Sequence, residues 1–269
     1  TFGSNYAITF QGAANVIDTA TTFNNTGTLT INNDNTDSST FTGGLTATAP
    51  SAINIAGTVA TTNTAMVLGD ADTGTTMTAD ATLVSGSGTI TTGAITDGGG
   101  SFSLDLGSGT QTGAITLGGS VTVNDLDTFA SAYNIIFQGA ANVIDTDTSF
   151  LNTGTVTFGN EDTDSTTFTG GLDTIAGPSG TNVIGTLATT NTAMDLNATT
   201  MLGNATLKSG SGAINVASIT DGAGSYNLSL GDGSQTGTIT FPGNVTVNAL
   251  TTFGSNYAIT FQGAANVID

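Results

Sequence analysis

The sequence predicts an all-β protein, and within that class a parallel β-helix (β-solenoid) in which short strands from successive turns stack on one another. Three observations predict this fold. The chain contains a long tandem repeat, its short segments place apolar residues at every second position, and Gly- or Asn-rich breaks separate those segments. Helical spacing is not sustained anywhere along the chain.

The tandem repeat can be read directly from the sequence. Residues Thr1–Asp18 return unchanged at Thr252–Asp269, and a variant with four differences occupies Thr128–Asp145. The three copies start 127 and 124 residues apart, which marks a tandem array. Because the outer copies are identical, we expect a higher-order block of 251 residues cut from a longer chain. The predicted organisation is a first subrepeat over 1–127, a second over 128–251 and the start of the next over 252–269.

Alternating segments supply the predicted strands. Apolar residues alternate with Thr, Ser or Asn, which is the period of a strand with one buried face. Such segments occur at Ala7–Phe10, Thr28–Asn32, Ala52–Gly57, Phe102–Gly107, Ala114–Gly119 and Val121–Asn124.

The breaks favour a solenoid over an array of sandwiches. Runs such as Ser85–Gly88, Asp97–Gly100 and Gly231–Ser234 provide the positive φ angles that tight corners require. Hairpin loops joining two equal strands are scarce, and the strand lengths are unequal. At roughly 20 residues per turn, about six turns fill each subrepeat of 124–127 residues.

Asparagines that follow strands are expected at the corners. Asn tolerates the left-handed region and can form ladders with its neighbours. We therefore expect stacked corner residues at Asn32, Asn124 and Asn248.

Charge and composition exclude several partners. Lys208 is the only basic residue against 20 acidic ones, so the formal net charge is −19. Such a surface disfavours binding to nucleic acid or to an anionic membrane. No apolar run approaches the ~18 residues of a membrane span. The absence of Cys excludes disulfides and thiolate metal sites.

One acidic loop recurs in each subrepeat and is the candidate for a cation. It lies at Asn32–Ser39 and again at Gly159–Thr167. Ca²⁺ takes about six to eight oxygen ligands, more than one such loop supplies. We therefore expect a solvated loop and assign no metal site, with Ca²⁺ as the open alternative. The residues concerned are Asp34, Asp37, Glu161, Asp162 and Asp164.

The pattern does not favour an enzyme. Without His, Cys or Arg, acid–base catalysis would fall to Asp, Glu, Tyr or the single Lys. Some β-helices cleave polysaccharides with two carboxylates alone. An active site normally occurs once in a chain, however, whereas nearly every sequence feature of this chain occurs in both subrepeats. We expect no catalytic residue and no cofactor.

Thr-x-Thr pairs raise an ice-binding alternative. A flat ladder of such pairs can match an ice lattice, but Thr is also a common solvent-facing strand residue. The pairs are irregularly spaced, which favours the second interpretation. They start at Thr28, Thr46, Thr89, Thr155 and Thr238.

Two partner segments, Gly107–Asn124 and Gly231–Asn248, resemble the β-helical repeats of large bacterial surface proteins. The similar families are filamentous haemagglutinin-like adhesins and autotransporter passenger domains. The resemblance lies in composition and rhythm over the whole chain. It implies an extracellular right-handed parallel β-helix that acts as a stalk, a fibre or an adhesive surface.

The expected function is therefore structural. We expect a segment of a secreted, cell-surface polypeptide that forms an extracellular fibre, stalk or sheath by self-association or by continuation of the same array. The alternative is an adhesin, a binding module for a surface, a carbohydrate or ice, whose variable loops near Ala71 and Ala176 make the contacts.

Overall fold

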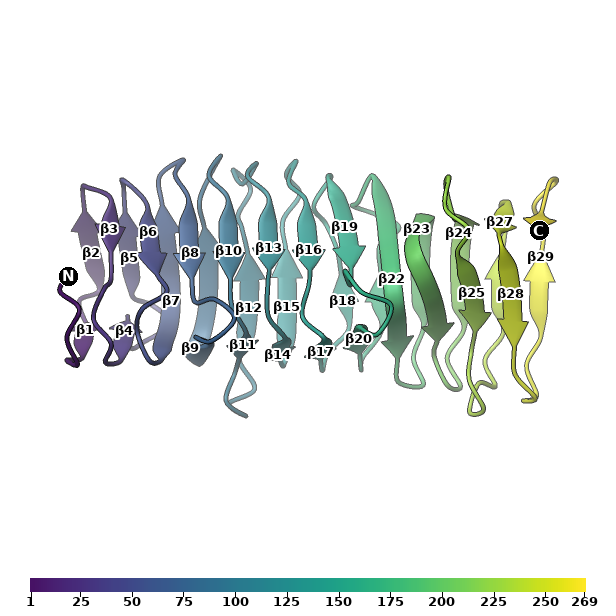
Figure 1. The fold of residues 1–269 in the computed structure, drawn as a ribbon, viewed down its shortest axis with the longest axis horizontal. Coiled ribbons are helices and arrows are strands. Elements are labelled where there is room, and N and C mark those ends of the chain that lie inside the picture. The colour runs from purple at the N-terminus through teal and green to yellow at the C-terminus, as the bar shows by residue number, and fades with distance from the viewer. The chain divides into compact units, whose positions relative to one another are not determined.

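A computed structural model describes all 269 residues, and it is all-β as predicted. The strands of successive turns pair in parallel. The chain forms no helix with the length and hydrophobicity of a membrane span. Two compact units are distinguished, Thr1–Gly139 and Ala140–Asp269. Each unit is a β-solenoid, with its strands drawn side by side in Figure 1.

The first unit contains sixteen strands, most of them three or four residues long. They are β1 (Ile8–Phe10), β2 (Ala14–Ile17), β3 (Thr21–Thr22), β4 (Leu29–Ile31), β5 (Ser38–Phe41), β6 (Leu45–Ala47), β7 (Ile53–Thr61), β8 (Met66–Leu68), β9 (Thr75–Val84), β10 (Ile90–Thr92), β11 (Ile95–Thr96), β12 (Ser103–Leu106), β13 (Ile115–Leu117), β14 (Val121–Val123), β15 (Asp125–Thr128) and β16 (Ile135–Phe137).

The second unit contains fourteen strands, of which β22 and β23 are long enough to bend round corners. They are β17 (Ala141–Ile144), β18 (Thr148–Ser149), β19 (Thr155–Phe158), β20 (Ser165–Phe168), β21 (Leu172–Asp173), β22 (Gly180–Thr189), β23 (Met194–Lys208), β24 (Ile214–Thr220), β25 (Asn227–Leu230), β26 (Ile239–Phe241), β27 (Val245–Val247), β28 (Ala249–Thr252), β29 (Ile259–Phe261) and β30 (Val267–Ile268).

Each turn of a solenoid supplies one strand segment to each of three sides. In the first unit, one side stacks β1, β4, the start of β7, the start of β9, β11 and β14 in register. Every partner lies one turn further along the chain: Ser38 pairs with Thr58, and Ile95 pairs with Val121. The spacing of these pairs agrees with the predicted turn of roughly 20 residues or slightly more.

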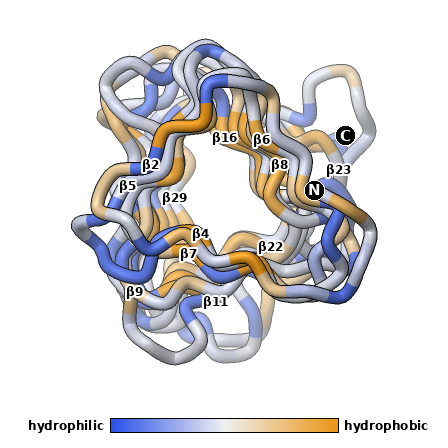
Figure 2. Tube along the Cα trace, turned by 90° about the vertical axis from the view of Figure 1, so that its left-hand side faces the viewer, coloured by the Kyte–Doolittle hydropathy of each residue, from blue (hydrophilic) through white to orange (hydrophobic).

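The alternation of the sequence builds the core. In β4, Leu29 and Ile31 are fully buried while Thr30 between them is partly exposed. Apolar residues accordingly lie along the inner sides of the turns (Figure 2). Burial of one such side chain contributes about 1.5–3 kcal/mol. Edge-to-face phenylalanine clusters add to the core, for example Phe150 against Phe168 at 5.9 Å between ring centroids.

The repeat does not equal a whole number of turns. Strands β1 and β16 are copies of one motif, yet β1 stacks on β4 whereas β16 stacks on β13, on another side. Because β7 and β9 each supply two sides, β16 lies 17 strand segments after β1. At three segments per turn this is five and two-thirds turns, close to the predicted six. The motif therefore moves by one side from the first copy to the second.

The three asparagines predicted at corners all lie at corners between strands, but only one of them is left-handed. Asn32 has a φ of 64° and is fully buried, and its amide nitrogen donates to the carbonyl oxygens of Ala56 and Thr58 in the next turn. Asn124 and Asn248 have no positive φ, but the chain bends at each of them between two strands that stack on different sides. Asn248 still forms a ladder, donating to the Oδ1 atom of Asn227 at 2.7 Å.

Candidate functional site

The acidic loops hold the chain at a corner of each unit. The carboxylate of Asp164 accepts hydrogen bonds from the backbone N–H groups of Asn160 and Glu161 at 2.9 and 3.0 Å. Its carbonyl oxygen accepts the N–H of Thr186 in the next turn at 2.8 Å. Gly185 has a φ of 76°, and a Cβ there would collide with that carbonyl. The loop therefore fixes β22 at the point between Val183 and Gly185 where its register with β23 shifts.

The first unit repeats this arrangement. Asp37 is almost buried, its carboxylate lies 3.3 Å from the N–H of Asn33, and its carbonyl oxygen accepts the N–H of Thr58. Asp34 is exposed and accepts from the N–H and hydroxyl of Thr36, which lowers the pKa of Asp34, the backbone hydrogen bond contributing most.

Asp162 lies in the same loop as Asp164 but bonds elsewhere. Its two oxygens bind the backbone N–H and the side-chain amide of Asn204 at 2.9 and 2.6 Å. Glu161 is exposed. Nowhere does the structure bring three acidic side chains together in a geometry that could hold a metal ion.

The Thr-x-Thr pairs do not stack on one side. Thr30 belongs to β4, whereas Thr46 and Thr91 belong to β6 and β10 on a different side. A ladder of single residues does exist, because the outward position of one side is Thr in five turns of six. It consists of Thr9, Thr30, Asn54, Thr76, Thr96 and Thr122.

A row of carboxylates occupies another side of the first unit. Asp105 and Asp127 are in-register neighbours on β12 and β15, and Asp125 is the in-register neighbour of Ser103. Asp80 accepts the N–H of Ser103 at 3.0 Å. Burial raises the pKa of Asp105, and Asp80 and Asp125 raise it further by repulsion. The second repeat places neutral residues at these points, namely Asn204, Ser229, Ala249 and Thr251.

The second unit has a polar groove of about 260 Å³ on its outer surface. Its floor follows from stacking: Thr167, Ala188 and Lys208 are register partners in three successive turns. The small Ala188 between two longer side chains leaves a depression. Thr189, the last residue of β22, also lines the groove. The other lining residues come from the corners that follow β22, β23 and β25, namely Thr190, Asn191, Gly210, Asp232 and Ser234.

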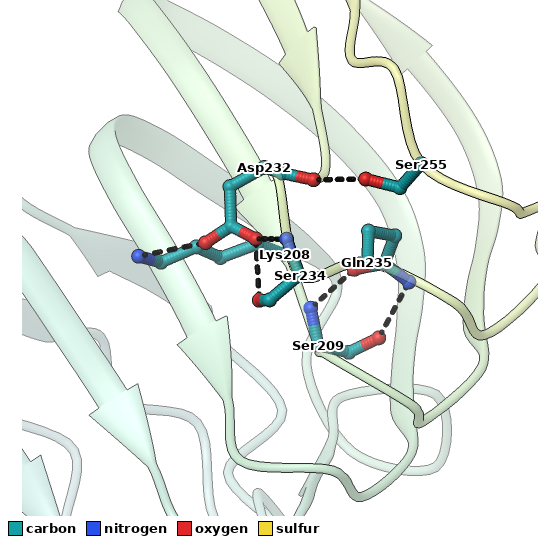
Figure 3. A network of polar contacts seen from close by, with 6 residues as sticks. All are labelled: Lys208, Ser209, Asp232, Ser234, Gln235 and Ser255. Atoms are coloured by element: carbon teal, nitrogen blue, oxygen red, sulfur yellow. Dashed lines mark hydrogen bonds and ion pairs between the residues drawn. The ribbon is translucent and has the colours of Figure 1, made fainter.

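An ion pair lies in this groove. Lys208 Nζ is 3.5 Å from Asp232 Oδ2, and both side chains are a little over one-third exposed. The other carboxylate oxygen accepts the hydroxyl and N–H of Ser234 at 2.6 and 2.8 Å, and the hydroxyl bond is the main cause that lowers the pKa of Asp232 (Figure 3). The carboxylate is therefore ionised and held in one orientation.

A buried network supports the loop that carries Asp232. Gln235 is fully buried, and its Nε2 donates to the carbonyl oxygen of Gly237 at 3.0 Å. Its Oε1 accepts the N–H of Ser209 at 2.9 Å (Figure 3). The Oγ atom of Ser255 donates to the carbonyl oxygen of Asp232 at 3.0 Å. The groove is thus built on a rigid corner.

A second groove, of about 410 Å³, is acidic. Asp147, Asp173 and Asp195 line it, and Asp173 and Asp195 are register partners. Asp195 accepts the amide of Asn215 at 2.7 Å, and Asp173 accepts the N–H of Ile175 at 2.6 Å. Asp173 and Asp195 therefore bond to the chain, and the three carboxylates do not form a group that could hold a metal ion.

Sequence reasoning missed the Lys208 groove. Lys208 and Asp232 are well separated in the sequence, and only the length of a turn brings them together. A comparison of the two repeats could have indicated the groove, because the counterparts of Lys208 and Asp232 in the first repeat are the uncharged Val84 and Ser108. Comparisons with protein-family models, curated proteins and solved structures found no match for this chain.

Proposed function

We propose that this chain is a structural segment of an extracellular fibre, stalk or sheath, built from a tandem array of β-solenoid repeats. Within each unit the mechanism is cumulative: every turn donates backbone hydrogen bonds to the next and extends one core, so stability grows with the number of turns. The likeness to β-helical surface proteins supports an extracellular location.

One observation carries this proposal: the buried contacts between turns are duplicated, whereas the charged groups of the carboxylate row and of the Lys208 groove are not. Gln111 and Gln235 each make the same buried corner bonds. Tyr133 and Tyr257 each donate to a leucine carbonyl of the previous turn, at 2.7 and 2.8 Å. The carboxylate row and the ion pair, by contrast, occur in one repeat each. A scaffold requires the same contacts between turns in each repeat, and these are the contacts that both repeats share.

The test is a series of chains that carry one, two and three 251-residue blocks. Each subrepeat of five and two-thirds turns should add about 27 Å at ~4.8 Å per turn. Electron micrographs should show rods of uniform width whose length grows by about 54 Å per block. Separate globular beads joined by linkers would contradict the proposal.

A second candidate function, a binding module displayed on the scaffold, is favoured by the Lys208 groove. Saturable binding that depends on the groove residues would support it. Rod length and binding are measured independently, so either function can fail alone.

A further inference from the structure

The chain places its only basic side chain in its polar groove. Lys208 belongs to a chain with a net charge of −19, and its one ionic partner is Asp232. At 3.5 Å this contact is longer than an ordinary hydrogen bond, so the ammonium group retains donor capacity. A surface pair of this kind stabilises a fold by only about 0–1 kcal/mol, so stability alone does not account for it.

The groove offers donors and acceptors beside one another. Asp232 Oδ2 accepts, while the Lys208 ammonium donates. Asn191 is locked at a φ of 60°, and its Oδ1 atom accepts the N–H of Ser211 at 3.1 Å, which leaves its NH₂ group as a donor. Thr167 and Thr190 contribute hydroxyls that can do both.

This set of groups matches a polyhydroxylated ring. Each sugar hydroxyl can donate one hydrogen bond and accept others, so neighbouring hydroxyls are recognised by an acceptor next to a donor. A volume of about 260 Å³ lies just below the range of roughly 300–1,000 Å³ for drug-sized ligands, and it suits one ring. The charges of Lys208 and Asp232 cancel, while the acidic surface around them repels anions.

We propose that the groove around Lys208 and Asp232 is a binding site for a single neutral sugar residue. Asp232 would accept from one hydroxyl, and Lys208 and Asn191 would donate to its neighbours. The proposal does not depend on the structural role of the chain.

The first repeat supplies a matched internal control. Its corresponding lining residues are the same at six of nine positions, and the floor Thr40, Ala60 and Val84 stacks in the same register. Val84 and Ser108 replace the charged pair there, and Thr110 replaces Ser234. A comparison of the two grooves therefore separates the effect of the ion pair on binding from the effect of the lining residues that both grooves share.

The direct experiment uses the single lysine as a probe. Labelling the full chain with ¹⁵N-lysine gives one backbone amide signal, that of Lys208, which is titrated with the methyl glycosides of glucose, galactose and mannose. At least one of them should shift the signal saturably, with millimolar affinity, and glucuronate should bind more weakly. A signal that stays unshifted with all three, or tighter binding of glucuronate, would overturn the proposal.

Variants then test the residues. Lys208→Val and Asp232→Ser import the residues of the first repeat and should each weaken sugar binding about tenfold or more, measured by saturation-transfer NMR on the sugar. Their circular-dichroism melting curves should match that of the unaltered chain. In the double variant, which carries both Lys208→Val and Asp232→Ser, adding Val84→Lys and Ser108→Asp should restore sugar binding, now in the groove of the first repeat. Unweakened binding in the double variant, or no binding after the transfer, would refute the assignment.

Discussion

The hydroxyl of Tyr133 donates a hydrogen bond of 2.7 Å to the carbonyl oxygen of Leu106 in the preceding turn. The same oxygen atom of Tyr133 accepts the N–H of Phe129 at 2.9 Å, and the tyrosine is almost fully buried. Tyr257 repeats both bonds with Leu230 and Phe253. One side chain thus ties a corner loop to the turn on which it stacks.

Replacing Tyr133 with Phe should lower the free energy of unfolding by about 1–3 kcal/mol, because the buried carbonyl of Leu106 loses its side-chain donor. Guanidinium unfolding curves measure the change. Tyr6→Phe is the matched control: Tyr6 is 38% exposed and its hydroxyl only accepts the N–H of Phe2. Its cost should stay below about 0.5 kcal/mol, and an equal loss in both variants would contradict the assignment.

Stability should also depend on Tyr133 at high pH. Burial raises the pKa of this phenol from 10.0 to about 12, whereas the hydrogen bond from Phe129 opposes the shift. Because the folded pKa is the higher one, the stabilisation is complete below pH 10 and disappears as the pH rises towards 12. The stability difference between the unaltered chain and Tyr133→Phe should shrink over this window. A constant difference would exclude the effect.

The carboxylate row of the first unit should be mildly destabilising at neutral pH. The pKa of Asp127 is raised by burial first and then by Asp125 and Asp105, while a hydrogen bond with Ser103 opposes the shift. Like charges directly opposite each other on paired strands cost about 0.2–1 kcal/mol, and solvent screening keeps the effect small here.

Asp105→Ser with Asp127→Thr, the residues of the second repeat, should therefore raise the melting temperature at pH 7. Since the folded pKa values of Asp105 and Asp127 lie above the ordinary value for an aspartate, the unaltered chain gains stability relative to the variant as the pH falls through them. Melting curves between pH 3 and 7 provide the measurement. A variant that melts lower at pH 7 would contradict this reasoning.

Close stacking at the corners makes some glycines irreplaceable. A Cβ on Gly113 would overlap the carbonyl oxygen of Gly88 in the previous turn, whereas Gly109 has no atom within 4 Å of such a Cβ. Gly113→Ala should therefore cost about 3 kcal/mol, the upper range for overpacking. Gly109→Ala should be neutral or stabilising by up to about 1 kcal/mol. Urea unfolding of both variants decides the comparison.

Calcium chelation should leave the melting temperature unchanged. The carboxylate of Asp164 is already bonded to the N–H groups of Asn160 and Glu161. Asp164→Ala should lower stability by about 1–3 kcal/mol with or without calcium. A melting temperature that falls with EDTA in the unaltered chain, but not in Asp164→Ala, would instead establish a metal site at this loop.

The ladder and the grooves could not be predicted from the sequence, because they depend on which residues of adjacent turns are neighbours. Alternation alone predicts which residues of a strand are buried, as in Leu29, Thr30 and Ile31, because alternation is a local property of the sequence. The neighbours of Thr30 in adjacent turns are Thr9 and Asn54, which lie at unequal distances from it along the chain. Because the length of a turn varies in this way, no fixed spacing in the sequence predicts a ladder or a groove.

The sequence by itself determined the strand character, the tandem repeat, the stacked architecture and the acidic surface, since each follows from local pattern or composition. Only the tertiary structure decided which residues share a side. It placed the first copy of the repeated motif on one side and the second copy on another, and it brought Lys208 to Asp232. The physical reason is that the hydrogen-bonded register between turns, set by corners of unequal length, fixes each residue's neighbours.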